Sequence, residues 1–135
     1  MKNILVPATF FMGFLIAGCS SALYLAEVDS LKQRAMLVEN RMSKAEMLSI
    51  MGKPEQRSFR NSEEAITFCA GRWLPSEGNI RLFYTVWLNN GEVVGVTNYQ
   101  LTNPGTGQSG QPCSKYLRSV DWGQSPYDRK IKVDV

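Results

Sequence analysis

Histidine is absent from all 135 residues of the sequence. This absence excludes a Ser–His catalytic pair, a histidine-ligated zinc site and an imidazole base. The acidic residues form no cluster that suggests a paired acid and base. Three glycines in a polar stretch lack the strand-to-helix context that a phosphate loop requires, namely Gly105, Gly107 and Gly110. We therefore expect no catalytic residue, no metal site, no cofactor and no small-molecule substrate, and we predict that the protein is not an enzyme.

The sequence also lacks a charge excess and a long apolar run. Its 15 Lys and Arg residues oppose 12 Asp and Glu residues, and the basic residues are scattered among the acids. Nucleic-acid binding needs a clustered basic face, so we expect no nucleic-acid partner. The apolar run from Ile4 to Phe14 is shorter than the roughly 20 residues of a bilayer-spanning helix. Its length instead favours the apolar core of a signal peptide.

A lipobox pattern ends this apolar run. Residues 1–18 would form a signal peptide, and cleavage would leave an acylated Cys19 at the start of the mature chain. The residues recognised by the signal peptidase would be Leu15, Ile16, Ala17 and Gly18. The alternatives are an ordinary secretory signal and an uncleaved anchor. The large Ile16 disfavours an ordinary secretory signal, because the cleavage site of such a signal has small residues. Stable anchoring takes two or more acyl chains, so a triacylated Cys19 would keep the chain on a membrane.

The residue after the cysteine indicates which membrane this is. An aspartate there typically retains lipoproteins at the inner membrane, so Ser20 predicts the outer membrane, with the domain facing the periplasm. Residues 19–40 would form the lipid anchor with a tether or helix, and residues 41–135 a single domain.

The remaining cysteines suit an exported protein. With Cys19 acylated, Cys69 and Cys113 are left as an even pair, which predicts a disulfide in an oxidising compartment. Two unpaired thiols or a redox dithiol are the alternatives. A redox pair usually has C-x-x-C spacing, and these two cysteines lie far apart.

Two helices are predicted before residue 55. Apolar residues recur at helical spacing from Ala22 to Val38. A capping box follows, in which Ser43 would be the N-cap and Glu46 would reach back to the Ser43 backbone. Gly52 and Pro54 would end this second helix.

Three strands are predicted after the helices, at Glu64–Trp73, Ile80–Leu88 and Glu92–Leu101. Asn90-Gly91 predicts a two-residue type I′ turn, which would place Leu88 opposite Val93 and Phe83 opposite Asn98. Alternation near residues 131–135 suggests an extra C-terminal edge strand. We therefore predict an α+β fold in which two N-terminal helices pack on one face of a three-stranded antiparallel sheet.

The two sheet faces have different expected roles. The face with Leu82, Tyr84, Val86 and Leu88 should pack on the helices, because it holds fewer polar groups. Phe83 and Trp87 on the other face would then be contacts for a partner protein, since interface hot spots are rich in such residues. Burial of both rings in the core, under the C-terminal segment, is the alternative.

Residues 41–54 resemble the opening of the SmpA/OmlA (BamE-like) family of small outer-membrane lipoproteins. The family pattern is G-M-[ST]-x-x-[EQ]-V-x-x-x-x-G-x-P, and the chain departs from it at Arg41, where glycine is usual. The strand order and the Asn-Gly turn also resemble this family. The cysteine pair is closest to that of the osmotically inducible lipoprotein OsmE, a relative in the same group.

This resemblance implies a protein that acts by contact. It would support envelope assembly or integrity by binding other envelope proteins, including the β-barrel assembly machinery. A role in osmotic or envelope stress, as in OsmE, is the first alternative. An inhibitor or binding module that acts on a periplasmic enzyme is the second.

Overall fold

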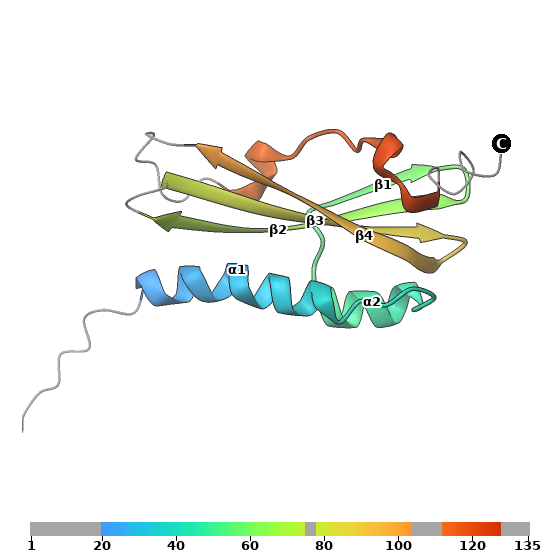
Figure 1. Cartoon of the computed structure of the whole chain (residues 1–135), viewed down its shortest axis with the longest axis horizontal. Helices are drawn as coiled ribbons and strands as arrows, with labels where there is room; N and C mark the ends of the chain where they lie inside the picture. The colour runs from blue at the N-terminus through green and yellow to red at the C-terminus, as the bar shows by residue number, and fades with distance from the viewer. Residues whose placement is uncertain (1–19, 75–77, 104–111, 128–135) are drawn as a thin grey trace, which may run out of the picture.

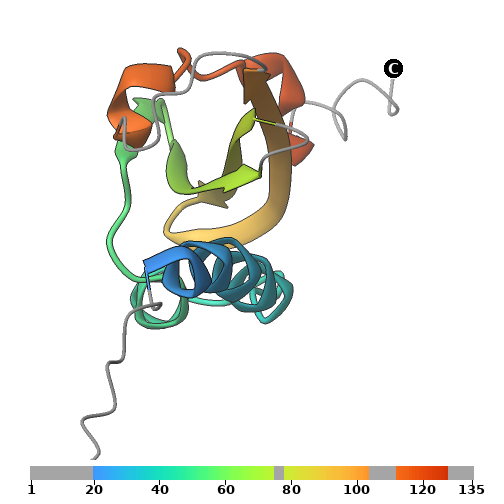
Figure 2. The ribbon, with the colours of Figure 1, turned by 90° about the vertical axis from the view of Figure 1, so that its left-hand side faces the viewer.

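Helices and sheet form an α+β architecture in a computed structural model that describes residues 20–74, 78–103 and 112–127. Helices α1 (Ser20–Met36) and α2 (Lys44–Met51) cover one face of a four-stranded antiparallel sheet. The C-terminal segment crosses the opposite face (Figure 1), and the end-on view shows the three layers stacked (Figure 2). Of the described helices, none is both long enough and apolar enough to cross a membrane.

The second helix begins where the sequence predicts. Glu46 N–H donates to Ser43 Oγ at 3.3 Å, and Ser43 N–H donates to Glu46 Oε2 at 2.9 Å. This reciprocal capping box satisfies two backbone donors that the first turn would otherwise leave free. At the other end, Gly52 adopts a φ of 84° and its N–H donates to Leu48 O at 2.9 Å.

Four strands make the sheet, in the order β1-β2-β3-β4: β1 (Gln56–Arg60), β2 (Glu63–Leu74), β3 (Gly78–Asn89) and β4 (Glu92–Asn103). The last three correspond to the predicted strands. Strand β1 was not predicted, because Phe59 is its only apolar residue. The expected C-terminal edge strand at residues 131–135 lies outside the described residues.

A β-bulge near the hairpin corrects the predicted register. The type I′ turn is present, with φ of 51° at Asn90 and 81° at Gly91, and Leu88 does pair with Val93. The next pair, however, is Trp87 with Gly95, so β4 contains one extra residue at this point. From there the register shifts by one, and Phe83 pairs with Tyr99 instead of Asn98.

The core lies between the helices and the sheet face that was expected to meet them. Buried side chains from both layers pack here, namely Val28, Leu31, Ala35, Met47, Met51, Ile66, Phe68, Ala70, Leu82, Val86, Leu88 and Val93. A polar contact joins the layers at the edge, where Lys44 Nζ lies 2.7 Å from Glu64 Oε2 and Arg57 Nε lies 3.3 Å from Glu64 Oε1. The prediction for this face is confirmed.

Candidate functional site between the sheet and the C-terminal segment

The residues of the predicted lipobox lie outside the described part of the chain. This applies to the recognition residues Leu15, Ile16, Ala17 and Gly18 and to the acylation site Cys19. The first described residue is Ser20, which is already the first residue of α1. Cleavage and lipidation therefore stay predictions.

The predicted disulfide is present. Cys69 on β2 is bonded to Cys113, with an S–S distance of 2.03 Å and a Cα–Cα distance of 6.1 Å. Cys113 begins a short 3-10 helix, η1 (Cys113–Tyr116). The bond thus brings the chain back to the sheet at the start of residues 112–127, which we call the strap.

The strap corrects the prediction for Phe83 and Trp87. These residues are 0% and 3% exposed, so neither ring is available as a contact on an open face. Phe83 stacks on Tyr99 at 4.5 Å between ring centroids, and Trp87 meets the edge of Trp122 at 5.7 Å. Both rings are core residues because the strap covers this face. Their burial under the C-terminal segment is the alternative stated in the sequence-based prediction.

Three contacts hold the second half of the strap to the sheet. Ser125 Oγ donates to Glu63 Oε1 at 2.8 Å, and both residues are buried. The Arg60 guanidinium lies 4.8 Å from the ring centroid of Trp122, which belongs to η2 (Trp122–Gln124). Pro126 packs on Gly95 so closely that a Cβ at residue 95 would come within 2.5 Å of Pro126 Cγ.

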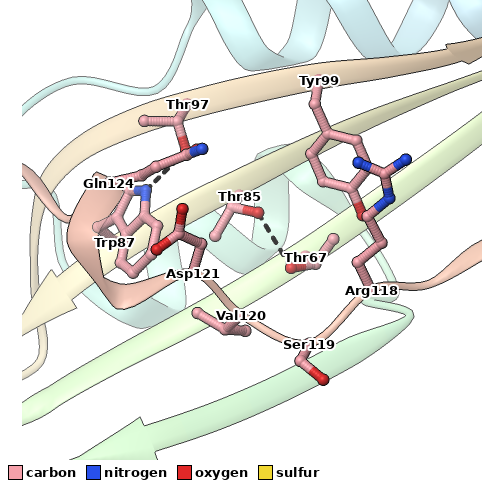
Figure 3. A pocket seen from close by; sticks show the side chains of 10 residues that line it. All are labelled: Thr67, Thr85, Trp87, Thr97, Tyr99, Arg118, Ser119, Val120, Asp121 and Gln124. Atoms are coloured by element: carbon pink, nitrogen blue, oxygen red, sulfur yellow. Dashed lines mark hydrogen bonds between the residues drawn. The ribbon is translucent and has the colours of Figure 1, made fainter.

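Between its two attachments the strap lines a partly open cavity of about 170 Å³ against the sheet. We call it the strap cavity (Figure 3). It is lined by Thr67, Thr85, Trp87, Thr97, Tyr99, Arg118, Ser119, Val120, Asp121 and Gln124. The first five come from β2, β3 and β4, and the others come from the strap.

A row of three threonines forms part of the lining. Thr67 pairs with Thr85, and Thr85 pairs with Thr97, so the three lie in register across β2, β3 and β4. The hydroxyls of Thr67 and Thr85 are 3.1 Å apart. Trp87 Nε1 donates to Thr97 Oγ1 at 2.8 Å.

The β-bulge places Thr97 and Tyr99 in this lining. Without the extra residue in β4, both would face the helices. Gly95 was the available signal, because an isolated glycine in a strand often marks a bulge or a close approach of another segment.

Charged side chains from the strap complete the cavity. The Arg118 guanidinium lies 5.8 Å from the ring centroid of Tyr99. Burial raises the pKa of Tyr99 above its usual 10.0, and a hydrogen bond to the Arg118 backbone and the charge of Arg118 partly oppose this rise. Asp121 carries the opposite charge, and its Oδ1 accepts a hydrogen bond from Gly123 N at 3.0 Å. The lining therefore offers hydroxyls, one cation and one anion, which are groups that can hydrogen-bond to a polar ligand.

An exposed aromatic ring lies outside the strap cavity. Phe59 on β1 is 67% exposed, and Lys44 Nζ lies 5.9 Å from its ring centroid. Sequence reasoning missed this residue because β1 itself was not predicted.

Within residues 20–74, 78–103 and 112–127, no three Cys, Asp or Glu side chains gather as a metal site. No family model, no curated protein and no solved structure matches the chain.

Proposed function

We propose that the chain is a non-catalytic lipoprotein of the outer membrane, anchored through acylated Cys19, with its domain facing the periplasm. It would support envelope assembly or integrity by contacts with other envelope proteins. The lipobox before Cys19, Ser20 after it and the resemblance to SmpA/OmlA lipoproteins support this proposal. The disulfide between Cys69 and Cys113 supports an oxidising compartment.

The position of α1 is the observation that carries the proposal. The helix begins at Ser20, directly after the residue that would be acylated. It packs on the sheet through Val28, Leu31 and Ala35. The 17 residues of α1 span about 25 Å at 1.5 Å per residue. Acyl chains on Cys19 would therefore hold the folded domain near the bilayer without a long flexible tether.

The end of the domain remote from Ser20 offers a surface for a partner protein. Phe59 pairs with Glu64, which pairs with Leu88 near the Asn90-Gly91 turn, so the exposed ring lies at this end of the sheet (Figure 1). Lys44 and Arg57 lie on the same side and share the single carboxylate of Glu64. Two cations against one anion leave a positive excess beside an exposed ring, which complements a partner surface with apolar and acidic groups.

Palmitate labelling in cells tests the anchor. The wild-type chain should incorporate label and the Cys19→Ala variant should not, while both keep the disulfide. Absence of label in the wild type, or label that persists in Cys19→Ala, would overturn the anchor.

A photoreactive residue at position 59 tests the contact surface in the intact envelope. It should crosslink to a defined envelope protein, and barrel-assembly subunits are the expected products. The matched control is the same residue at Gln100, which is exposed on β4. Equal crosslinking from both positions would show that Phe59 is not a specific contact with a partner protein.

The disulfide favours a second candidate function, because its cysteine pair resembles that of OsmE. In that case the protein would act in osmotic or envelope stress. A deletion phenotype that appears only at high osmolarity would favour this candidate. Recovery with a single soluble periplasmic enzyme would instead indicate the inhibitor-like alternative.

A further inference from the structure

The strap cavity has no role in an account based on anchoring and protein contacts. We propose that it binds a small molecule with a carboxylate at one end and a hydrogen-bond donor, an ammonium or a hydroxyl, at the other. This inference does not depend on the lipid anchor or on the partner protein. It rests on the hydroxyl row, on the two charged residues and on the size of the cavity.

The threonine row has hydroxyl hydrogens to offer. Each threonine hydroxyl has one donor and two acceptor sites. Thr67 and Thr85 share one hydrogen bond, so whichever hydroxyl accepts keeps its own hydrogen for another acceptor. Thr97 accepts from Trp87 Nε1 and likewise keeps its own hydrogen. This part of the lining therefore suits a ligand with acceptor oxygens.

Arg118 supplies the site for a carboxylate. A guanidinium presents a planar set of donors that matches a carboxylate with two parallel hydrogen bonds. Arg118 is solvent-exposed, and its guanidinium lies 5.8 Å from the ring centroid of Tyr99 at the rim of the cavity. In Figure 3, Arg118 lies at the Tyr99 end of the lining.

Asp121 supplies the site for the donor end of the ligand. In Figure 3 it lies toward Trp87, with the Thr67–Thr85 pair between it and Arg118. One of its oxygens accepts from Gly123 N, and a carboxylate has about four lone-pair sites, so it can accept further hydrogen bonds. A ligand with carboxylates at both ends would meet repulsion here. A ligand with two ammonium groups would meet repulsion at Arg118.

The cavity volume limits the size of the ligand. A volume of about 170 Å³ is well above the roughly 10–15 Å³ that one water requires. It is below the roughly 300–1,000 Å³ typical of sites for drug-sized ligands. An amino acid or hydroxy acid of a few carbons fits between these limits.

Titration of the full chain by NMR tests the proposal, with the assigned indole N–H of Trp87 as the probe inside the cavity. Glycine, β-alanine and γ-aminobutyrate differ only in the number of methylene groups between their two charges. The series therefore samples a range of distances between a group bound at Arg118 and a group bound at Asp121. At least one of them should shift the Trp87 signal saturably, with a Kd in the millimolar range. Butyrate and butylamine each lack one charged end of γ-aminobutyrate. Both should bind at least about tenfold more weakly than the best member of the series.

Two variants test whether Arg118 binds the carboxylate end of the ligand and Asp121 binds the donor end. Arg118→Gln and Asp121→Asn should each weaken binding about tenfold, and asparagine can still accept from Gly123 N. Lys115→Gln removes an exposed strap cation outside the lining and should change nothing. Dispersed spectra would show that each variant is folded. A Trp87 signal that none of the three amino acids shifts would overturn the proposal. So would butyrate or butylamine binding as tightly as the best member of the series, or a Kd that Arg118→Gln leaves unchanged.

Discussion

Ser125 Oγ donates a 2.8 Å hydrogen bond to Glu63 Oε1 across a separation of 62 residues. The same carboxylate accepts from Arg60 Nη2 at 2.7 Å through its other oxygen. Ser125 is 0% exposed and Glu63 is 6% exposed, so water does not compete for this bond. The bond fixes the end of the strap opposite the disulfide, and the strap cavity lies between these two attachments.

Ser125→Ala should lower the free energy of unfolding by about 1–3 kcal/mol, because it leaves a buried carboxylate oxygen without its partner. Urea denaturation measures the change. Ser114→Ala is the matched control, since Ser114 is exposed on η1. An equal loss in both variants would contradict the role given to the Glu63 contact.

Reduction of the disulfide should have a larger effect. Cys69 and Cys113 are separated by 44 residues, for which the chain-entropy relation gives about 4 kcal/mol of stabilisation. Urea unfolding with and without reductant should differ by up to this amount. A Cys69→Ala, Cys113→Ala double variant should be insensitive to reductant, and sensitivity in that variant would contradict the assignment.

Arg41→Gly should stabilise the fold. Arg41 has a φ of 72°, a left-handed conformation that costs a non-glycine residue about 1–2 kcal/mol. Glycine removes this cost but loses more conformational freedom on folding, so the expected net gain is up to about 1 kcal/mol in the free energy of unfolding. Arg41→Ala is the control, because it removes the side chain without relieving the backbone. An equal gain in Arg41→Ala would point to the side chain instead.

The capping box should give α2 a dependence on acid pH. The backbone N–H and the hydroxyl of Ser43 hydrogen-bond to the Glu46 carboxylate and hold the pKa of Glu46 below its usual 4.5. Because the folded pKa is the lower one, this stabilisation is present above pH 4.5 and is lost as the pH falls through the folded pKa.

An NMR titration of the Glu46 carboxyl carbon checks this expectation. In Ser43→Ala the pKa of Glu46 should rise only part of the way to 4.5, because the backbone N–H, which lowers it most, remains. A complete return to 4.5, or no change, would contradict the assignment of causes.

Local signals predicted much of this fold. The Ser43–Glu46 capping box and the Asn90-Gly91 turn are decided by residues that are close in sequence, and both are present. The disulfide between Cys69 and Cys113 was a longer-range prediction. It rested on the expected oxidising compartment and on the two cysteines that remain once Cys19 is set aside. The smaller number of polar groups on one sheet face identified it as the face that meets the helices.

Features that depend on distant segments were not predicted. β1 is an edge strand with little apolar character, and its pairing with β2 defines it more than its own residues do. Gly95, beside the bulge, makes room for Pro126; an isolated glycine in a strand signals a close approach, but no local pattern identifies a residue 31 positions later as the neighbour. The row of Thr67, Thr85 and Thr97 follows from this one shift in register, whereas Trp87 is buried because the strap covers its face.

Glu63 and Glu64 are neighbours on β2 whose side chains leave opposite faces of the sheet. One carboxylate holds Ser125 of the strap, and the other holds Lys44 at the start of α2. A pulling force applied at the N-terminus would reach β2 partly through the contact between Lys44 and Glu64, one residue from the Glu63 carboxylate that holds the C-terminal segment. Mechanical strain on the helices would thus be passed to both outer layers through a single dipeptide.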